Sequence, residues 1–358
     1  MTTDRTSTGN SPLLIDIQTA VAGLGDAFQT AMARAPDAVV EADYRIAGYP
    51  VRIRTVGSQQ AENIDRALCH LRAAAGTDHE LTIDIWNEEE VGPVHWAPWP
   101  ERGETYDTVT VSDDNRYILT QREGSVLLLD RKKDHIVGGL RGWNRLYQDE
   151  RVRPFHRLLS VWLDDRDIQF VHAGLVAHGE NGLLYVGKGG SGKTTTSIAS
   201  FLGGLAFLSD DYVALEATAN GDFIGHSLYA TCLADHMERF PPLLPVAMTP
   251  NYTVEVKDGI FLLDVPDTHL RAQVRLAAVI LPRIVSQPDT TYRPATTMEA
   301  LLALAPSSLW KLPHAAKNSL DKHAGLLTSV PAFWLELGRD IGQIAPTVKR
   351  LAAELTNT

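Results

Sequence analysis

An eight-residue segment in the middle of the chain has the residue types of a phosphate-binding loop. It reads Gly-Lys-Gly-Gly-Ser-Gly-Lys-Thr and fits G-x-x-x-x-G-K-[ST] at every fixed position. Glycines let backbone N–H groups turn toward phosphate oxygens. Lys193 can reach the β- and γ-phosphates, and the Thr194 hydroxyl can ligate Mg²⁺. The residues expected to contact the nucleotide are Gly187, Lys188, Gly189, Gly190, Ser191, Gly192, Lys193, Thr194 and Thr195.

The segments around this loop have the context that the motif requires. The apolar run 183–186 precedes the loop and predicts a strand, and the residues after the loop predict a helix whose N-terminus favours anions. A second apolar run, 205–208, leads into Ser209-Asp210-Asp211. In a parallel β-α-β unit both strands end at the same edge of the sheet. We therefore expect Asp210 and Asp211 to lie beside the phosphates.

Composition places the chain among ordinary globular proteins. Its 358 residues leave room for two domains, and 44% of them are hydrophobic. The net charge of −11 gives no basic field that would attract nucleic acid or an anionic membrane. No apolar run reaches the length of a membrane span, and residues 1–12 lack the apolar segment of a signal peptide. Cys69 and Cys232 have no metal-ligand spacing, so we interpret them as buried apolar residues. We expect a cytoplasmic protein.

Residues 1–150 predict an α+β domain without a catalytic motif. An amphipathic helix starts near Leu14, and the segments that follow predict strands at 42–56 and 81–86, a helix at 58–75 and an antiparallel meander at 107–139. The proline-rich segment 87–103 predicts an exposed loop. Its Trp96 and Trp99 either cover a ligand or pack locally. We place the domain boundary near Arg151.

Residues 151–358 predict an α/β domain around the phosphate-binding loop. Residues 141–164 predict helix, and 170–177 predict one strand that contains His172. Residues 239–251 contain four prolines and cannot form a long regular helix. Further strands are expected at 212–215, 223–229, 254–263, 277–281 and 333–337, and further helices at 298–305, 314–327 and 341–355.

The order of these motifs resembles the catalytic domain of HPr kinase/phosphorylase. The resemblance is carried by His172, by the loop 187–194 and by the segment 209–213, in which Asp210 follows Lys193 by only 17 residues. It covers roughly residues 150–358 and implies that family's P-loop fold, which is related to phosphoenolpyruvate carboxykinase. The segments 276–284 and 334–338 are similar to a broader bacterial group of HPr-kinase-related proteins. Some of these accompany lasso-peptide biosynthesis and phosphorylate a serine of the precursor peptide.

The resemblance implies roles for the acidic pair and the histidine. Asp210 would remove the proton from the acceptor hydroxyl, and Asp211 would hold the metal, although the two roles are open to exchange. His172 would lie beside the phosphates, and Lys193 would hold them. Phosphoryl transfer requires positioning, charge neutralisation and a group that orients the attacking hydroxyl. The sequence offers a candidate for each.

The chain also departs from the family pattern. The family's Glu-Ile-Arg-Gly motif, whose Glu helps to bind metal, corresponds to residues 226–231, which contain no carboxylate. The second metal ligand is therefore unassigned, with Asp235 as a candidate. Lys257 and Arg283 are expected at strand ends and either contact the transferring phosphoryl group or are exposed charges. The family's N-terminal domain is not recognisable in residues 1–150.

We expect an ATP- and Mg²⁺-dependent kinase that phosphorylates a hydroxyl, on a serine of a peptide or small protein. One alternative is a kinase of a small molecule such as an amino acid or a sugar. The other is a regulatory module that binds ATP without turning it over. An acceptor-binding role is a hypothesis for residues 1–150, and the resemblance implies a homo-oligomer.

Overall fold

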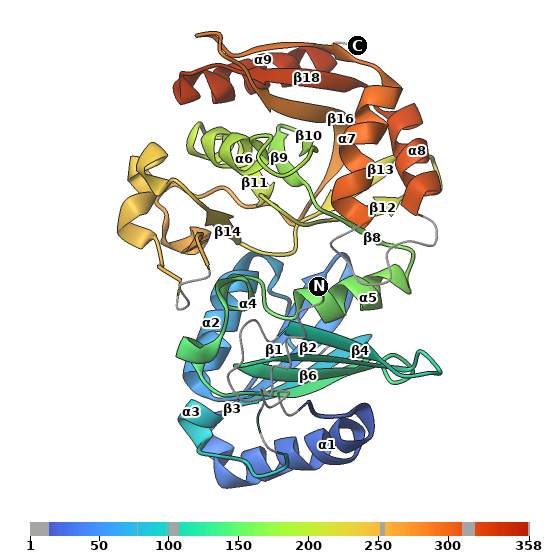
Figure 1. Ribbon diagram of the computed structural model, residues 1–358, viewed down its shortest axis with the longest axis vertical. Helices are drawn as coiled ribbons and strands as arrows, with labels where there is room; N and C mark the ends of the chain where they lie inside the picture. Colours follow the sequence, from blue (N-terminus) through green and yellow to red (C-terminus); the bar gives the residue numbers. More distant parts are fainter. Residues whose placement is uncertain are drawn as a thin grey trace, which may run out of the picture.

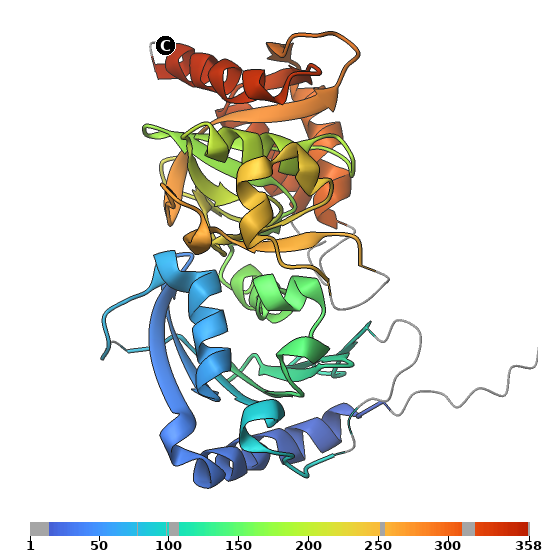
Figure 2. The ribbon, with the colours of Figure 1, turned by 90° about the vertical axis from the view of Figure 1, so that its left-hand side faces the viewer.

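The computed structural model describes residues 14–76, 78–97, 99, 107–250, 255–309 and 319–356. It contains two large β-sheets, one from residues 39–140 and one from residues 169–337, which lie one above the other along the long axis (Figures 1 and 2). Residues 1–13, position 254 of one predicted strand and the predicted helix start at His314 lie outside the described residues.

The first sheet has seven strands in the order β1-β2-β3-β7-β6-β5-β4. Strands β4 to β7 pair antiparallel in sequence order and form the predicted meander. Strand β3 lies parallel to both β2 and β7, which joins the meander to the β1–β2 hairpin. The strands are β1 (Val39–Ile46), β2 (Tyr49–Val56), β3 (Leu81–Asn87), β4 (Asp107–Val111), β5 (Tyr117–Arg122), β6 (Ser125–Asp130) and β7 (His135–Leu140).

Helix α1 (Ile17–Arg34) covers one face of this sheet. It starts at Asp16, whose side chain accepts a hydrogen bond of 2.9 Å from the Thr19 N–H, a typical N-cap. Its buried Leu24 and Phe28 belong to the same apolar cluster as Trp86 of β3. The opposite face carries α2 (Ser58–Leu68) and α5 (His156–Asp164), and α4 (Gln148–Val152) precedes α5.

The prediction of an exposed loop over 87–103 was wrong for part of that segment. Residues Glu88–Val91 form the short helix α3, and Val91 is buried. Trp96 meets Trp86 edge-on with ring centroids 6.4 Å apart, and the Trp99 indole N–H donates to Glu88 at 2.8 Å. Local packing is therefore the interpretation that the structure supports for both tryptophans.

The second sheet is mixed and is built around the long strand β16 (Gln273–Ile284). The main strand order is β11-β9-β10-β16-β13-β12-β8, and β18 pairs with β16 and with β17. Helix α6 (Lys193–Leu202) and α9 (Ile344–Thr356) cover one face, and α7 (Thr297–Leu309) and α8 (Ser319–Ser329) cover the other. The remaining strands are β8 (Gln169–Val171), β9 (Gly174–His178), β10 (Asn181–Tyr185), β11 (Ala206–Ser209), β12 (Val213–Ala217), β13 (Phe223–His226), β17 (Thr291–Ala295) and β18 (Ala332–Leu337).

The prediction of a single strand over 170–177 was wrong, because His172 and Ala173 separate two strands, β8 and β9. Strand β8 pairs with β12 at one end of the strand order, whereas β9 lies between β10 and β11 near the other end. Only residues 172 and 173 separate the two strands, and two residues span less than about 10 Å. The sheet must therefore curl back on itself until its two ends meet near His172.

One apolar cluster continues from the first sheet into the second half of the chain. It contains Ile83 and Leu127 of the first sheet, Leu158 of α5, and Phe170 and Tyr229 of the second half. The two sheets therefore share buried packing, and the domain boundary near Arg151 stays a prediction.

Candidate active site

The glycine-rich loop joins the end of β10 to the start of α6. Gly192 has a left-handed φ of 103° directly before the helix, and a Cβ there would lie 2.5 Å from a methyl carbon of Leu337. Glycine is therefore required both by the backbone conformation and by the space. Strand β9 lies between β10 and β11 and antiparallel to both, so β10 and β11 run in the same direction. The loop after β10 and the acidic pair after β11 thus share one edge of the sheet.

A cavity of about 330 Å³ lies at this edge. The loop and α6 supply one wall of it. Its lining residues are His172, Gly189, Gly190, Gly192, Lys193, Thr194, Thr195, Asp211, Asp235, His236, Arg239, Lys257 and Ile284. The Lys193 ammonium group donates to the Gly187 carbonyl at 2.6 Å, inside the loop. The structure therefore brings most of the predicted nucleotide-binding residues together with Asp211 and His172.

The two neighbouring aspartates have different surroundings. The Asp210 side chain is only 2% exposed, accepts a hydrogen bond of 3.0 Å from the Leu233 N–H and is not among the cavity-lining residues. The Asp211 side chain is 14% exposed and lines the cavity, where it pairs with the His172 ring. Burial raises the pKa of Asp210. Burial acts in the same direction on Asp211, but Arg153 and His172 outweigh it and hold the pKa of Asp211 well below its usual range.

Arg153 joins both aspartates and was missed by the sequence analysis. Its guanidinium donates to Asp211 at 2.6 Å and to Asp210 at 3.0 Å, and its side chain is only 4% exposed. It lies between α4 and α5, where the Val152 carbonyl accepts from Thr231 at 2.7 Å and the Pro154 carbonyl accepts from Tyr229 at 3.0 Å. Those bonds hold the segment against the second half. An arginine far from the loop in sequence carries no motif that would have identified it.

Tyr212 packs against three groups that surround the acidic pair. Its ring lies 5.7 Å from the ring of His172 and 5.8 Å from that of His156, and the Arg153 guanidinium lies 5.5 Å from its centre. These contacts fix His172 beside Asp211. The aromatic packing thus links α5 to the cavity.

Of the other candidates from the sequence, Asp235 and Lys257 line the cavity, and Arg283 does not. Arg283 pairs with Glu336 at 2.5 Å and lies 4.9 Å from the Trp334 ring centre. Arg239 and His236 are additional lining residues that the sequence analysis did not single out. Gly187, Lys188 and Ser191 belong to the loop but do not line the cavity.

The cavity fits a nucleotide phosphate chain with a magnesium ion. Gly189 and Gly190 leave open space around their α-carbons, with no atom within 4 Å of a built Cβ. Such a backbone surface, at the N-terminus of a ten-residue helix, suits phosphate oxygens. Thr194 and Asp211 could hold Mg²⁺, which binds to one or two protein oxygens together with phosphates and water. In the part of the chain that the structure describes, no group of three or more His, Cys, Asp or Glu forms a metal site.

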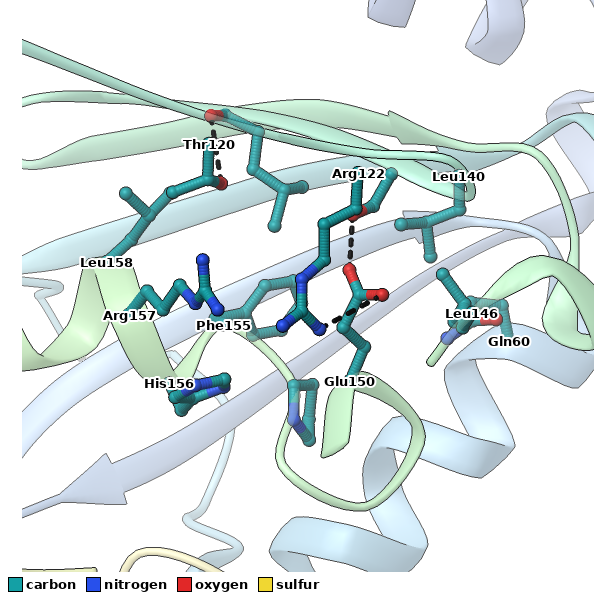
Figure 3. Close-up of a pocket in the computed structure, with 13 residues that line it drawn as sticks. Gln60, Thr120, Arg122, Leu140, Leu146, Glu150, Phe155, His156, Arg157 and Leu158 are labelled. Carbon is teal, nitrogen blue, oxygen red and sulfur yellow. Dashed lines mark hydrogen bonds and ion pairs between the residues drawn. The ribbon is translucent and has the colours of Figure 1, made fainter. Parts of the chain in front are cut away.

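A second cavity, of about 40 Å³, lies in the first half of the chain. Figure 3 shows Arg122 paired with Glu150 there, with Phe155 and Leu158 close by. None of the site residues predicted from the sequence lines it. However, residues 154–158 line it, and the residue before them, Arg153, contacts Asp211 of the larger cavity.

Comparisons with known proteins add little to this picture. No family model matches the chain, and no curated protein matches it in sequence. Among solved structures, the chain is similar to the Hpr(Ser) kinase/phosphatase from Coxiella burnetii, with a TM-score of 0.30 and 16% identity over 53% of this chain and 93% of that chain. In the described residues, no helix is both long and apolar enough to cross a membrane. A TM-score of 0.30 is too low to bear on activity, so the function must be argued from the geometry of the cavity.

Proposed function

We propose that the protein is an ATP- and Mg²⁺-dependent kinase that transfers the γ-phosphoryl group to a hydroxyl. One observation carries this proposal: the glycine-rich loop, Lys193 and Thr194 share one cavity with Asp211 and His172. A phosphate-binding loop alone would support nucleotide binding only. A partly exposed carboxylate on the same cavity, kept ionised by Arg153, adds a group that can orient an attacking hydroxyl or hold the metal.

We assign to Asp211 both of the roles that were first divided between the two aspartates, because Asp211 lines the cavity and Asp210 does not. Asp211 faces the cavity, so we assign to it the contact with the reacting groups. Asp210 is turned toward Arg153 and the Leu233 N–H. Its proposed role is to hold Arg153 in place. His172 would orient Asp211 through the contact between its ring nitrogen and the carboxylate.

Magnesium would neutralise charge on the phosphates when it is bound. The chain would contribute the Thr194 hydroxyl and Asp211 as ligands, and Lys193 would leave the Gly187 carbonyl to reach the phosphate oxygens. Asp235 lines the same cavity and is the candidate for a second ligand. The proposed acceptor is a serine of a peptide or small protein. This choice rests on the resemblance of His172 and of the segments 187–194 and 209–213 to HPr kinase/phosphorylase and its relatives.

The experiment measures transfer of labelled phosphate from ATP to candidate acceptors, together with nucleotide affinity. We expect Lys193→Ala to lower both. Asp211→Asn should abolish transfer, because an amide cannot accept the hydroxyl proton, and should weaken Mg²⁺-dependent ATP binding less than Lys193→Ala does, because the amide oxygen and Thr194 can still ligate the metal. Asp222→Asn, on an exposed residue outside the cavity, is the matched control. Transfer that survives both Lys193→Ala and Asp211→Asn would exclude this function.

A regulatory ATP-binding module is the second candidate, and one observation favours it. Both aspartates are already engaged, Asp210 by Arg153 and Asp211 by Arg153 and His172. A carboxylate held in this way is less available to an acceptor. Tight Mg²⁺-dependent ATP binding without label in any peptide, amino acid or sugar would favour the module over the kinase.

A further inference from the structure

The wall of the cavity opposite the glycine-rich loop is a two-stranded ribbon with a following turn. Strands β14 (Thr231–Ala234) and β15 (Asp258–Phe261) pair antiparallel, with Ala234 opposite Asp258. The next residues outward, Asp235 and Lys257, therefore emerge at the same end of the ribbon, where both line the cavity. Figure 1 shows this yellow-to-orange segment beside α6 and β11.

The ribbon is fixed to the acidic pair and to the core. The Leu233 N–H donates to Asp210 at 3.0 Å. In the turn that follows, Met237 and Phe240 are 5% and 3% exposed and pack in the apolar cluster that includes Ile198 of α6. Because these two residues point inward, the turn between them presents Arg239 to the cavity.

Arg239 has no ion-pair partner among the residues that the structure describes. No carboxylate of those residues lies within 4.0 Å of its guanidinium, whereas Arg153 pairs with two. Lys193 and Lys257 line the same cavity, and the N-terminus of α6 adds partial positive charge. Cations that face one space repel one another unless an anion lies between them. Two carboxylates also line the cavity, but Asp211 is already paired with Arg153 and His172, and Asp235 is a single negative charge against Arg239, Lys193 and Lys257, so the cavity suits a bound anion.

We propose that Arg239, together with Lys257, binds the terminal phosphate of the donor nucleotide from the side opposite the glycine-rich loop. This inference rests on the proposed function, because it takes the bound anion to be a nucleotide. The loop and Lys193 would hold the phosphates from one wall, and Arg239 would complete the enclosure from the other. A guanidinium suits this place because its planar set of donors can meet two oxygens of one phosphate.

The test compares the affinities of ADP and a non-hydrolysable ATP analogue, each with Mg²⁺, for the full chain and its variants. We expect Arg239→Gln to weaken binding of the ATP analogue by about tenfold or more, the loss expected for one charge-assisted hydrogen bond. Binding of ADP should change by less than about twofold, because ADP lacks the third phosphate. Arg239→Lys, which keeps the charge, should recover part of the loss.

Arg275→Gln is the matched control, because Arg275 is an exposed arginine on β16 that is not among the cavity-lining residues. Equal weakening of ADP and the ATP analogue by Arg239→Gln would overturn the inference, as would no weakening of either. If the wild type binds ATP but labels no acceptor, the proposed kinase activity is refuted. The comparison of ATP-analogue and ADP affinities still decides the role of Arg239. A wild type that binds neither nucleotide refutes both.

Discussion

Replacing Arg153 with methionine tests how the acidic pair is held. The substitution leaves Asp210 and Asp211 buried, with side chains 2% and 14% exposed, but without the guanidinium that bridges them. Removing one partner of a buried ion pair costs about 3–5 kcal/mol. A domain is stable by about 5–15 kcal/mol in total, so the loss should be large. We expect the free energy of unfolding, measured by urea denaturation at pH 7.5, to fall by this amount.

The pH dependence of the Arg153→Met effect has a definite sign. Burial already raises the pKa of Asp210, and the loss of Arg153 should raise it further; the same loss should raise the pKa of Asp211 from its lowered position. Protonation then relieves the uncompensated charge in the folded state. The destabilisation should therefore be larger at pH 7.5 than at pH 5.

Two further variants make the measurement decisive. Arg131 pairs with Asp165 at the surface, with both side chains about one third exposed, so Arg131→Met should cost about 1 kcal/mol or less. Adding Asp210→Asn to Arg153→Met should recover part of the stability, because one of the two unpaired charges is removed. A loss for Arg153→Met no larger than that for Arg131→Met would refute the reasoning.

Three other outcomes are expected. Burial lowers the pKa of His70 from 6.5 to about 4, so between these pH values the unfolded chain binds a proton that the folded chain does not bind. The free energy of unfolding should therefore fall as the pH drops from 6.5 to 4. His70→Gln should flatten that part of the stability-versus-pH curve. Gly192→Ala should destabilise the folded protein by about 1–3 kcal/mol and weaken ATP binding, because the φ of Gly192 is left-handed and Leu337 occupies the space of an added Cβ. Gly189→Ala should leave the melting temperature nearly unchanged, because the space around Gly189 is open. Leu158→Ala should cost about 2–5 kcal/mol, because Leu158 is 1% exposed in the cluster shared by both sheets, and calorimetry should still show one transition; two separate transitions would contradict a shared core.

Much of the local structure could be predicted from residue patterns. The alternating segments near Gly48 form the expected hairpin, the meander at 107–139 pairs as expected, and the loop 187–194 lies between a strand and a helix. In each case a short-range signal decides the outcome: strand alternation, turn residues or a glycine-rich motif. Asp211 lies at the cavity because the parallel strands β10 and β11 end at one edge of the sheet. His172 lies at the same edge because it precedes β9, which runs antiparallel to both.

What the sequence did not reveal depends on contacts between distant segments. Arg153 forms a hydrogen bond with Asp210, which lies 57 residues later in the sequence. No sequence pattern near either residue predicts this contact. The turn that carries Arg239 is placed by burial of Met237 and Phe240 against α6, which is a tertiary effect. The interruption between β8 and β9 at His172 arises because β8 pairs with β12 and β9 pairs with β11, near opposite ends of the strand order. Alternation within one segment cannot reveal which partner each half will choose.

The curled sheet has a consequence for how this region tolerates change. Strand β8 is fixed by β12 and strand β9 by β10 and β11, so the two-residue connection containing His172 spans a set distance. A residue inserted there could not be accommodated by shifting the register of β8 or β9. A shift of either strand by one position would turn its buried side chains outward. Natural variants of this chain should therefore vary in length at the exposed Gly221 turn between β12 and β13, and keep a connection of fixed length at His172.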